Sequence, residues 1–107
     1  MTDKELIESI RDRPGLYTLD GTYYATVMLV VGIDLGMSGR LLDGWRDWLL
    51  ARKGEPNSRM WICLVLEDAF PGAGIWHWSH LTQEQQQHAV DHLFTLLIAF
   101  LSERDAV

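Results

Sequence analysis

Apolar residues recur every three or four positions near both ends of the chain, which is the spacing of one helix face. The first stripe lies within residues 2–12, and the last lies within residues 83–103. The last stripe consists of Val90, Leu93, Phe94, Leu97, Phe100 and Leu101. Both stretches begin with a threonine followed three residues later by Glu or Gln, which is the capping-box pattern of a helix start. We therefore predict a helix at each end of the chain.

The clearest amphipathic pattern in the middle of the chain covers residues 39–53. Its apolar stripe consists of Leu41, Leu42, Trp45, Trp48 and Leu49. Charged residues fall largely on the opposite side, and Gly54 and Pro56 follow as helix terminators. We predict a helix over 39–53 whose two tryptophans lie in the core, and we expect Trp61 in the core as well.

Two strongly apolar segments, 22–31 and 60–66, have no clear period. Both contain β-branched and aromatic residues, so propensity alone allows buried strands. The first segment does not alternate and has no clear hairpin partner, and the second is followed directly by acidic residues. We favour helices over 22–36 and 58–69, with strands as the open alternative for both segments.

The ends of these two helices have candidate signals. Gly32 and Gly36 would allow close helix packing or fix the end of a helix that we expect to be buried on most faces. Asp34 should lie near that end, solvated or accepting backbone hydrogen bonds. Asn57 or Ser58 is the candidate N-cap of the helix over 58–69.

The remaining segments have turn chemistry. Pro14-Gly15 should end the first helix, and 16–21 is a connector in which 16–19 could form a short extended piece. Residues 71–80 contain Pro, two Gly and no helical period, which indicates a loop. We therefore predict one mainly α domain over residues 1–107, a compact bundle of about four to five helices.

The composition is that of a globular protein. The chain has 107 residues, of which 48% are hydrophobic and 22% charged. One cysteine, Cys63, excludes an internal disulfide framework and indicates a reducing compartment. The N-terminus lacks the pattern of a secretory signal, and the longest apolar run is too short to span a membrane. We expect a cytoplasmic protein without membrane association.

The balance of charges narrows the choice of partner. Fifteen acidic residues against nine basic ones give a net charge of -6, and the basic residues are scattered. A nucleic-acid backbone would be repelled by this charge, so we predict no nucleic-acid partner. An acidic surface suits docking on a basic protein.

Four histidines provide the main candidate for metal chemistry. His88 and His92 share one helix face, His77 and His80 precede that helix in the loop, and Cys63 is the one thiol. No Cys-x-x-Cys or His-Glu-x-x-His pattern is present, so we predict no metal and no cofactor. We expect His88 and His92 to lie on a solvated flank of the helix, with a zinc site as the alternative.

Catalytic chemistry by other routes has little support in the residues. Cys63 lies inside an apolar run, which indicates a buried and inert thiol. The chain has no Gly-x-Ser-x-Gly elbow, and neighbouring carboxylates usually form a solvated face. We therefore predict that the protein is not an enzyme.

The strongest binding signal lies in the loop. Trp76 and Trp78 bracket His77 there, and Glu67 and Asp68 precede the loop. Tryptophan is the residue most enriched in interface hot spots, so we take these five residues as the candidate partner-binding site. The alternative is that both tryptophans fold under the loop and close the core.

The segment Arg13-Pro14-Gly15-Leu16-Tyr17 resembles an Arg-Pro-Gly-Met-Tyr segment found in two groups of proteins. One group is the ATPase subunit of type II topoisomerases, which we reject because its Glu/Asn helix and glycine-rich lid are absent here. The other is a group of small bacterial proteins of similar length. Their likeness runs from about Leu6 to Leu101 and includes segments similar to 44–49 and 93–101. Those proteins are similar to immunity proteins of bacterial toxin systems, so the resemblance implies such a role, with no catalytic residue.

Three functions therefore stand as hypotheses. The first is a protein that neutralises a cognate toxin by occlusion. The alternative is a structural or regulatory helical module that self-associates, for instance as a homodimer. The third is a small metal-dependent enzyme that uses His77, His80, His88 and His92.

Overall fold

The structure is a computed structural model that describes residues 1–17 and 19–106. Within those ranges the chain forms five α helices and two 3-10 helices, with no β strand. In chain order they are α1 (Asp3–Asp12), η1 (Pro14–Tyr17), α2 (Tyr23–Gly36), α3 (Trp45–Lys53), α4 (Trp61–Ala69), η2 (Trp78–His80) and α5 (Gln83–Arg104). The prediction of a mainly α bundle is confirmed, and both ambiguous apolar segments are helical.

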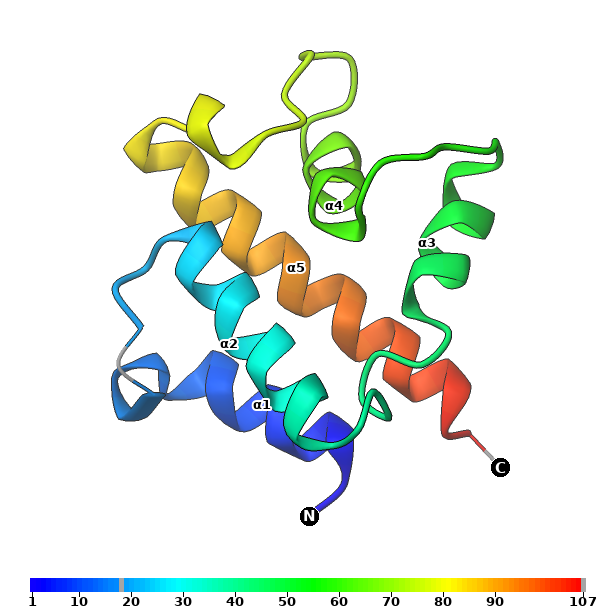
Figure 1. The fold of residues 1–107 in the computed structure, drawn as a ribbon. Coiled ribbons are helices and arrows are strands. Elements are labelled where there is room, and N and C mark those ends of the chain that lie inside the picture. The colour runs from blue at the N-terminus through cyan, green and yellow to red at the C-terminus, as the bar shows by residue number, and fades with distance from the viewer. Residues whose placement is uncertain (18, 107) are drawn as a thin grey trace.

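Helix α5 is the centre of the bundle. It crosses the molecule diagonally, with α1 and α2 on one side and α3 and α4 on the other (Figure 1), and it contacts all four. Residues from all five helices form one buried cluster, whose largest fully buried members include Trp45, Tyr23, Ile7, Leu66 and Leu93. Burial of this apolar surface is the main force that stabilises the fold. No helix in the described part of the chain has both the length and the hydropathy to span a membrane.

Both predicted capping boxes are present. The Oγ1 of Thr2 accepts from the backbone N–H of Glu5 at 3.1 Å, and the Glu5 carboxylate accepts from the Thr2 N–H at 3.1 Å. Thr82 and Gln85 make the same reciprocal pair at the start of α5. Each box satisfies two backbone donors that a helix start otherwise leaves open, so α1 and α5 begin where the sequence predicts.

The predicted helix over 39–53 is wrong in its first six residues. Residues 37–39 and 41–44 form turns, and α3 begins only at Trp45. The backbone of Gly39 and Gly44 is left-handed, with φ of 81° and 85°, which a right-handed helix cannot accommodate. Leu41 is nevertheless fully buried and packs on the core from the turn. Asp34 supports this turn, because its Oδ1 accepts from the Leu42 N–H at 2.9 Å, as expected near a helix end.

The predicted helix over 58–69 also begins later, at Trp61. Neither Asn57 nor Ser58 is its N-cap, because that position is occupied by Met60 without a side-chain cap. The Asn57 Oδ1 instead accepts from the Arg59 N–H at 2.8 Å, which forms a local turn before the helix.

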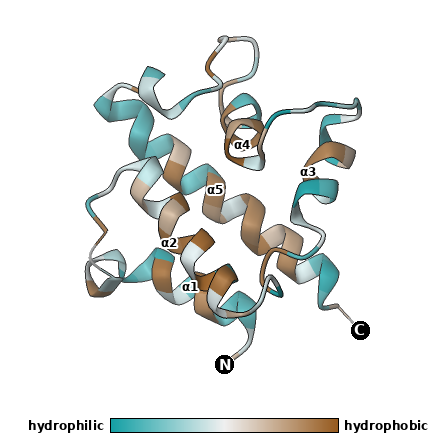
Figure 2. Cartoon of the chain, in the orientation of Figure 1, coloured by the Kyte–Doolittle hydropathy of each residue, from teal (hydrophilic) through white to brown (hydrophobic). Residues whose placement is uncertain are grey.

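The prediction that α2 is buried on most faces is wrong. Its buried side consists of Tyr23, Thr26, Val27 and Val30, and α2 packs against α5. Tyr24, Met28 and Leu35 are exposed on the helix by 45%, 40% and 74%. Figure 2 shows that apolar residues make up much of α2. The sequence pattern has no period because α2 is apolar on its inner and its outer side.

The three helical tryptophans expected in the core differ in burial. Trp45 is fully buried, whereas Trp48 and Trp61 are half-buried and pack against the core from its edge. The ring centroids of Trp48 and Trp61 lie 5.8 and 5.9 Å from that of Trp45. The three rings therefore form one aromatic cluster between α3 and α4.

One ion cluster joins the two ends of the chain, and we call Asp3, Arg40 and Arg104 the terminal clamp. The Asp3 Oδ2 accepts from Arg40 at 2.8 Å and from Arg104 at 3.1 Å, and the Asp3 side chain is only 10% exposed. The Nη1 of Arg104 donates to the carbonyl oxygens of residues 40, 41 and 43 at 3.0, 2.8 and 3.3 Å. The clamp thus holds α1, α5 and the turn before α3 together.

Candidate functional site

The loop 71–80 connects α4 to α5, as predicted. It begins with a tight turn in which Gly72 and Gly74 have φ of 75° and 71°, a conformation that other residues rarely adopt. It ends in η2, where the His77 Nδ1 accepts from the Ser79 N–H at 3.1 Å and caps the short helix. The loop therefore has a defined conformation that can present its side chains.

The aromatic rings of the loop form a ladder that starts on α2. The centroid of Trp78 lies 5.2 Å from that of Tyr24 and 3.9 Å from that of His77. The next ring is Trp76, whose centroid is 5.8 Å from that of His77. Trp78 is half-buried and packs against the core, whereas Trp76 is 40% exposed. Trp78 therefore packs on the core, as the alternative interpretation predicts, whereas Trp76 lies at the surface.

One basic side chain, that of Arg59, lies against the exposed tryptophan. The guanidinium carbon of Arg59 lies 4.8 Å from the ring centroid of Trp76, which is cation–π geometry. Arg59 also pairs with the Oε1 of Glu67, and the Nζ of Lys53 lies 3.0 Å from the Oε2. Glu67 is thus a carboxylate shared by two cations that come from different segments.

These residues line an open cleft of about 760 Å³ between the end of α3, the segment before α4 and the loop. Its lining residues are Lys53, Pro56, Asn57, Ser58, Arg59, Glu67, Phe70, Pro71, Gly72, Gly74, Ile75 and Trp76. The walls combine an aromatic face, aliphatic surface and paired charges. A central aromatic side chain with polar groups at its rim is also the arrangement of many protein–protein interfaces.

Asp68 lies in an adjoining hollow of about 440 Å³ that shares Lys53, Glu67 and Pro71 with the cleft. Its Oδ1 is 3.0 Å from the Nε of Arg52, and its Oδ2 is 2.5 Å from the Nε2 of His92. Partial burial alone would raise the pKa of Asp68, but the hydrogen bonds from His92 and Arg52 outweigh it and lower the pKa below its usual value. Asp68 therefore links α3, α4 and α5 as a carboxylate.

The four histidines do not come together. His77 and His80 lie in the loop, while His88 and His92 lie on α5 and face α4. His88 is exposed, as the solvated-flank interpretation predicts, although its Nε2 lies 3.0 Å from the carbonyl oxygen of Ala69, whereas the His92 side chain is only 22% exposed. Among residues 1–17 and 19–106, no group of three or more His, Cys, Asp or Glu is arranged to hold a metal ion.

Cys63 is buried in α4, as the sequence predicts. Burial raises the pKa of its thiol, which keeps the sulfur protonated at neutral pH. A protonated, enclosed thiol is a poor nucleophile, so we assign Cys63 a packing role.

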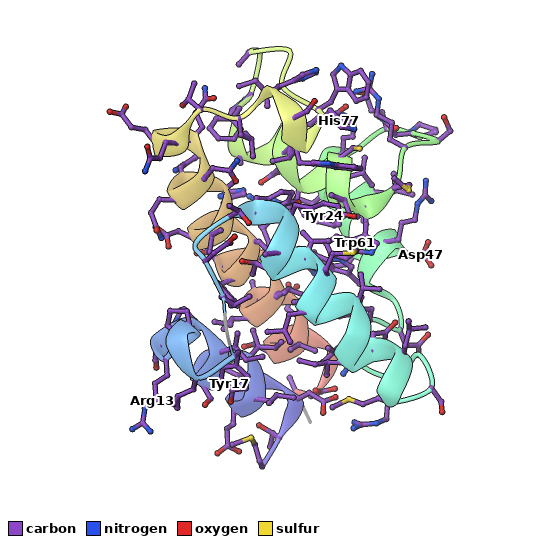
Figure 3. The ribbon with its side chains drawn as sticks, turned by 60° about the vertical axis from the view of Figure 1, so that its left-hand side comes forward. Arg13, Tyr17, Tyr24, Asp47, Trp61 and His77 are labelled. Carbon is purple, nitrogen blue, oxygen red and sulfur yellow. The ribbon has the colours of Figure 1, made fainter. Side chains whose placement is uncertain are left out.

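The segment Arg13–Tyr17 is part of the scaffold. The Arg13 N–H donates to the carbonyl oxygen of Ser9 and closes α1, and η1 follows directly. The Tyr17 hydroxyl lies 3.3 Å from the Ser9 Oγ. Leu16 and Tyr17 are therefore 3-10 helical rather than extended, and Thr18 lies outside the described residues. Figure 3 shows Arg13 and Tyr17 at the opposite end of the molecule from His77.

The five predicted binding residues are divided among the cleft, the adjoining hollow and the aromatic ladder. Trp76 and Glu67 line the cleft, Asp68 lines the adjoining hollow, and His77 and Trp78 form the ladder behind them. Sequence reasoning missed Arg52, Lys53, Arg59 and Tyr24, which complete these places. Their contacts join segments distant in sequence, and a local pattern could have indicated only that they are polar or aromatic.

The chain was also compared with known proteins. No protein-family model, no curated protein and no solved structure matches it. The cleft and the loop themselves are therefore the features from which a function can be inferred.

Proposed function

We propose that this protein is a non-catalytic protein-binding domain that neutralises a cognate bacterial toxin by occluding its active surface. The observation that carries the proposal is the position of Trp76, which is 40% exposed at the edge of a cleft of about 760 Å³. A large ring held by a structured loop is the type of anchor that dominates interface energetics. The resemblance of Arg13–Tyr17 to a segment of immunity-like bacterial proteins supports the toxin as the class of partner.

Charge supports a basic toxin as the target. The chain has a net charge of -6, so a basic surface would be attracted at long range and oriented by complementary potentials. The cleft itself contains both signs of charge, which suits local pairing after the encounter. We propose the cytoplasm as its compartment, because one buried cysteine suits reducing conditions.

The proposal is tested by affinity capture from the cells that express the protein, with wild type and Trp76→Ala as baits. We expect wild type to capture one stoichiometric partner that stops growth when expressed alone and does not when wild type is co-expressed. Trp76→Ala should lose both the capture and the rescue, because its binding anchor is removed.

Leu16→Ala is the matched control, since Leu16 is 72% exposed and lies in η1, which ends at Tyr17. Figure 3 shows Tyr17 at the opposite end of the molecule from His77. It should behave like wild type in both assays. A captured partner without toxicity would contradict the immunity function, and a toxin that Trp76→Ala still neutralises would contradict the cleft as its binding site.

A further inference from the structure

The charged side chains of the cleft have hydrogen-bond donors to spare, whereas their acceptors are already engaged. The Glu67 Oε1 accepts from the Nη1 of Arg59, and its Oε2 accepts from the Nζ of Lys53 at 3.0 Å. The Nε and Nη2 of Arg59 make no hydrogen bond to any other residue in the described part of the chain. A ligand that accepts hydrogen bonds therefore suits this cleft better than one that donates them.

Local charge agrees with the distribution of donors. The charged lining residues are Lys53, Arg59 and Glu67, which give the cleft one net positive charge on a chain of net charge -6. Residues 44–80 contain four basic and four acidic residues, and these include Glu55, which is 3.6 Å from Lys53 and 69% exposed. The rest of the chain contains five basic and eleven acidic residues. Because salt screens distant charges, the nearby cations determine which group the cleft attracts at contact.

We propose that the cleft binds the side-chain carboxylate of an acidic residue in the partner, next to an apolar side chain that packs on Trp76. The carboxylate accepts from the Nε and Nη2 of Arg59, which form one edge of the guanidinium and match the two oxygens of a carboxylate. The protein nature of this ligand rests on the function proposed above. Attraction of a basic toxin by the acidic remainder of the chain is compatible with one acidic side chain at the contact.

The apolar part of the ligand follows from the position of the ring. The guanidinium carbon of Arg59 is 4.8 Å from the centroid of Trp76, so a carboxylate on Arg59 lies beside the exposed ring. Half-buried Phe70 and Ile75 line the same cleft. The cleft volume of about 760 Å³ is within the range of about 300–1,000 Å³ that is common for ligand sites. A short peptide segment with an acidic residue between apolar ones therefore fits both the charge and the surface.

Arg59 is already held in place before a ligand arrives. Its N–H donates to the Asn57 Oδ1 at 2.8 Å, and its carbonyl oxygen accepts from the Nη2 of Arg46 at 3.1 Å. The side chain is fixed between the Trp76 ring and Glu67. Binding to such an ordered arginine loses less side-chain entropy than binding to a mobile one, which favours affinity.

The test is an NMR titration of the purified full chain with three capped peptides: Ala-Leu-Glu-Leu-Ala, and the same peptide with Gln or Lys at its centre. The signal to follow is the indole N–H of Trp76. The indole N–H of Trp48, which donates to Glu103 outside the cleft, is the internal reference. The Glu peptide should bind about tenfold more tightly than the Gln peptide, because charge-assisted hydrogen bonds are stronger than neutral ones, and the Lys peptide should bind most weakly.

Two variants should change the affinity for the Glu peptide in opposite directions. Arg59→Ala removes the two donors, so it should abolish the preference for Glu over Gln. Glu67→Gln removes a negative charge beside the ligand and retains an oxygen that accepts from Lys53, so it should tighten binding by about threefold. Glu8→Gln makes the same change of charge on α1, which lies across the molecule from the loop 71–80 (Figure 1), and it should bind like wild type.

Equal affinity for the Glu and Gln peptides would overturn the proposal, and so would tighter binding of the Lys peptide or a Trp76 signal that no peptide shifts. Retention of the preference for Glu by Arg59→Ala would overturn it as well. The titration needs no toxin, so these results are distinct from those of the capture experiment. A captured partner without toxicity would contradict the immunity function and leave the preference for a carboxylate in place.

Discussion

The terminal clamp and the cleft each contain an arginine beside a shared carboxylate, yet the two arginines have different surroundings. Arg104 is 23% exposed and donates to three carbonyl oxygens and to Asp3. Arg59 is 44% exposed and contacts the Trp76 ring and Glu67. The clamp joins segments at both ends of the chain, whereas the cleft remains open.

Because of this difference, we expect Arg104 to contribute mainly to the stability of the fold and Arg59 mainly to binding. Removal of a charged donor from backbone carbonyls at a partly enclosed site lowers the free energy of unfolding, because water does not fully replace the lost hydrogen bonds. Exposed pairs contribute little to folding, because water and salt screen them. We therefore expect substitutions in the clamp to lower the free energy of unfolding and substitutions in the cleft to lower the affinity for a partner.

Arg104→Ala should destabilise the fold more than any other substitution considered for the clamp or the cleft. It removes the donor for three carbonyl oxygens and one of the two arginine partners of Asp3, so it should lower the free energy of unfolding by about 2–3 kcal/mol. Urea denaturation monitored by circular dichroism measures this. A loss no greater than that of Arg59→Ala would contradict the distinction between clamp and cleft.

The next effect distinguishes the two loop tryptophans. Trp78 packs between Tyr24, His77 and the core, so Trp78→Ala should lower the free energy of unfolding by about 2 kcal/mol. Trp76→Ala should lower it by less than about 1 kcal/mol, because the ring is at the surface. The same denaturation experiment tests both, and equal losses would mean that Trp76 belongs to the scaffold.

The sequence pattern predicts which segments are helical, but it does not predict where α3 begins or which helix faces are covered by neighbours. Thr2 and Thr82 mark helix starts through local hydrogen bonds, so their capping boxes were predictable from residues three apart. The turn before α3 depends on left-handed backbone at Gly39 and Gly44. The regular spacing of the leucines in this stretch predicts a helix instead, so the pattern does not reveal the turn. The exposure of one side of α2 could not be predicted either, because an all-apolar composition does not indicate which side of the helix another helix covers.

The candidate site was predictable in part for the same physical reason. Trp76 and Trp78 were recognisable as binding candidates from the loop composition, but their different burial depends on Tyr24, which lies more than 50 residues earlier. The pairing of Glu67 with Lys53 and Arg59 joins three segments. Local spacing contains no information about such contacts.

A smaller effect concerns Asp68 and its dependence on pH. The pKa of Asp68 is lower in the folded protein, so its contribution to stability is present above the unfolded pKa of about 3.9 and is lost as pH falls further. Asp68→Asn should lower the free energy of unfolding at neutral pH by about 1 kcal/mol, and the difference from wild type should shrink at acidic pH.

Asp47→Asn is the control for that experiment, because Asp47 is exposed on α3. Urea denaturation at several pH values between neutral and acidic measures both variants. A difference between Asp68→Asn and wild type that stays constant with pH would contradict the role of the ionised carboxylate.

The smallest effect on folding is expected for Arg59→Ala. Its pair with Glu67 is exposed and Lys53 remains beside the same carboxylate, so the free energy of unfolding should change by less than about 0.5 kcal/mol. The free energy of binding to the captured partner should change by more than the free energy of unfolding, since Arg59 packs against Trp76 in the cleft. An affinity equal to that of wild type would contradict a role of Arg59 in binding the partner.

One variant, Trp76→Ala, separates the contribution of the cleft to binding from its contribution to folding. Titration calorimetry with the captured partner gives the affinity, and urea denaturation gives the free energy of unfolding. We predict a loss of binding free energy of about 2 kcal/mol or more with less than about 1 kcal/mol lost in folding. Unchanged affinity, or a loss of binding that only follows a loss of folding, would contradict the claim that the cleft is the binding site.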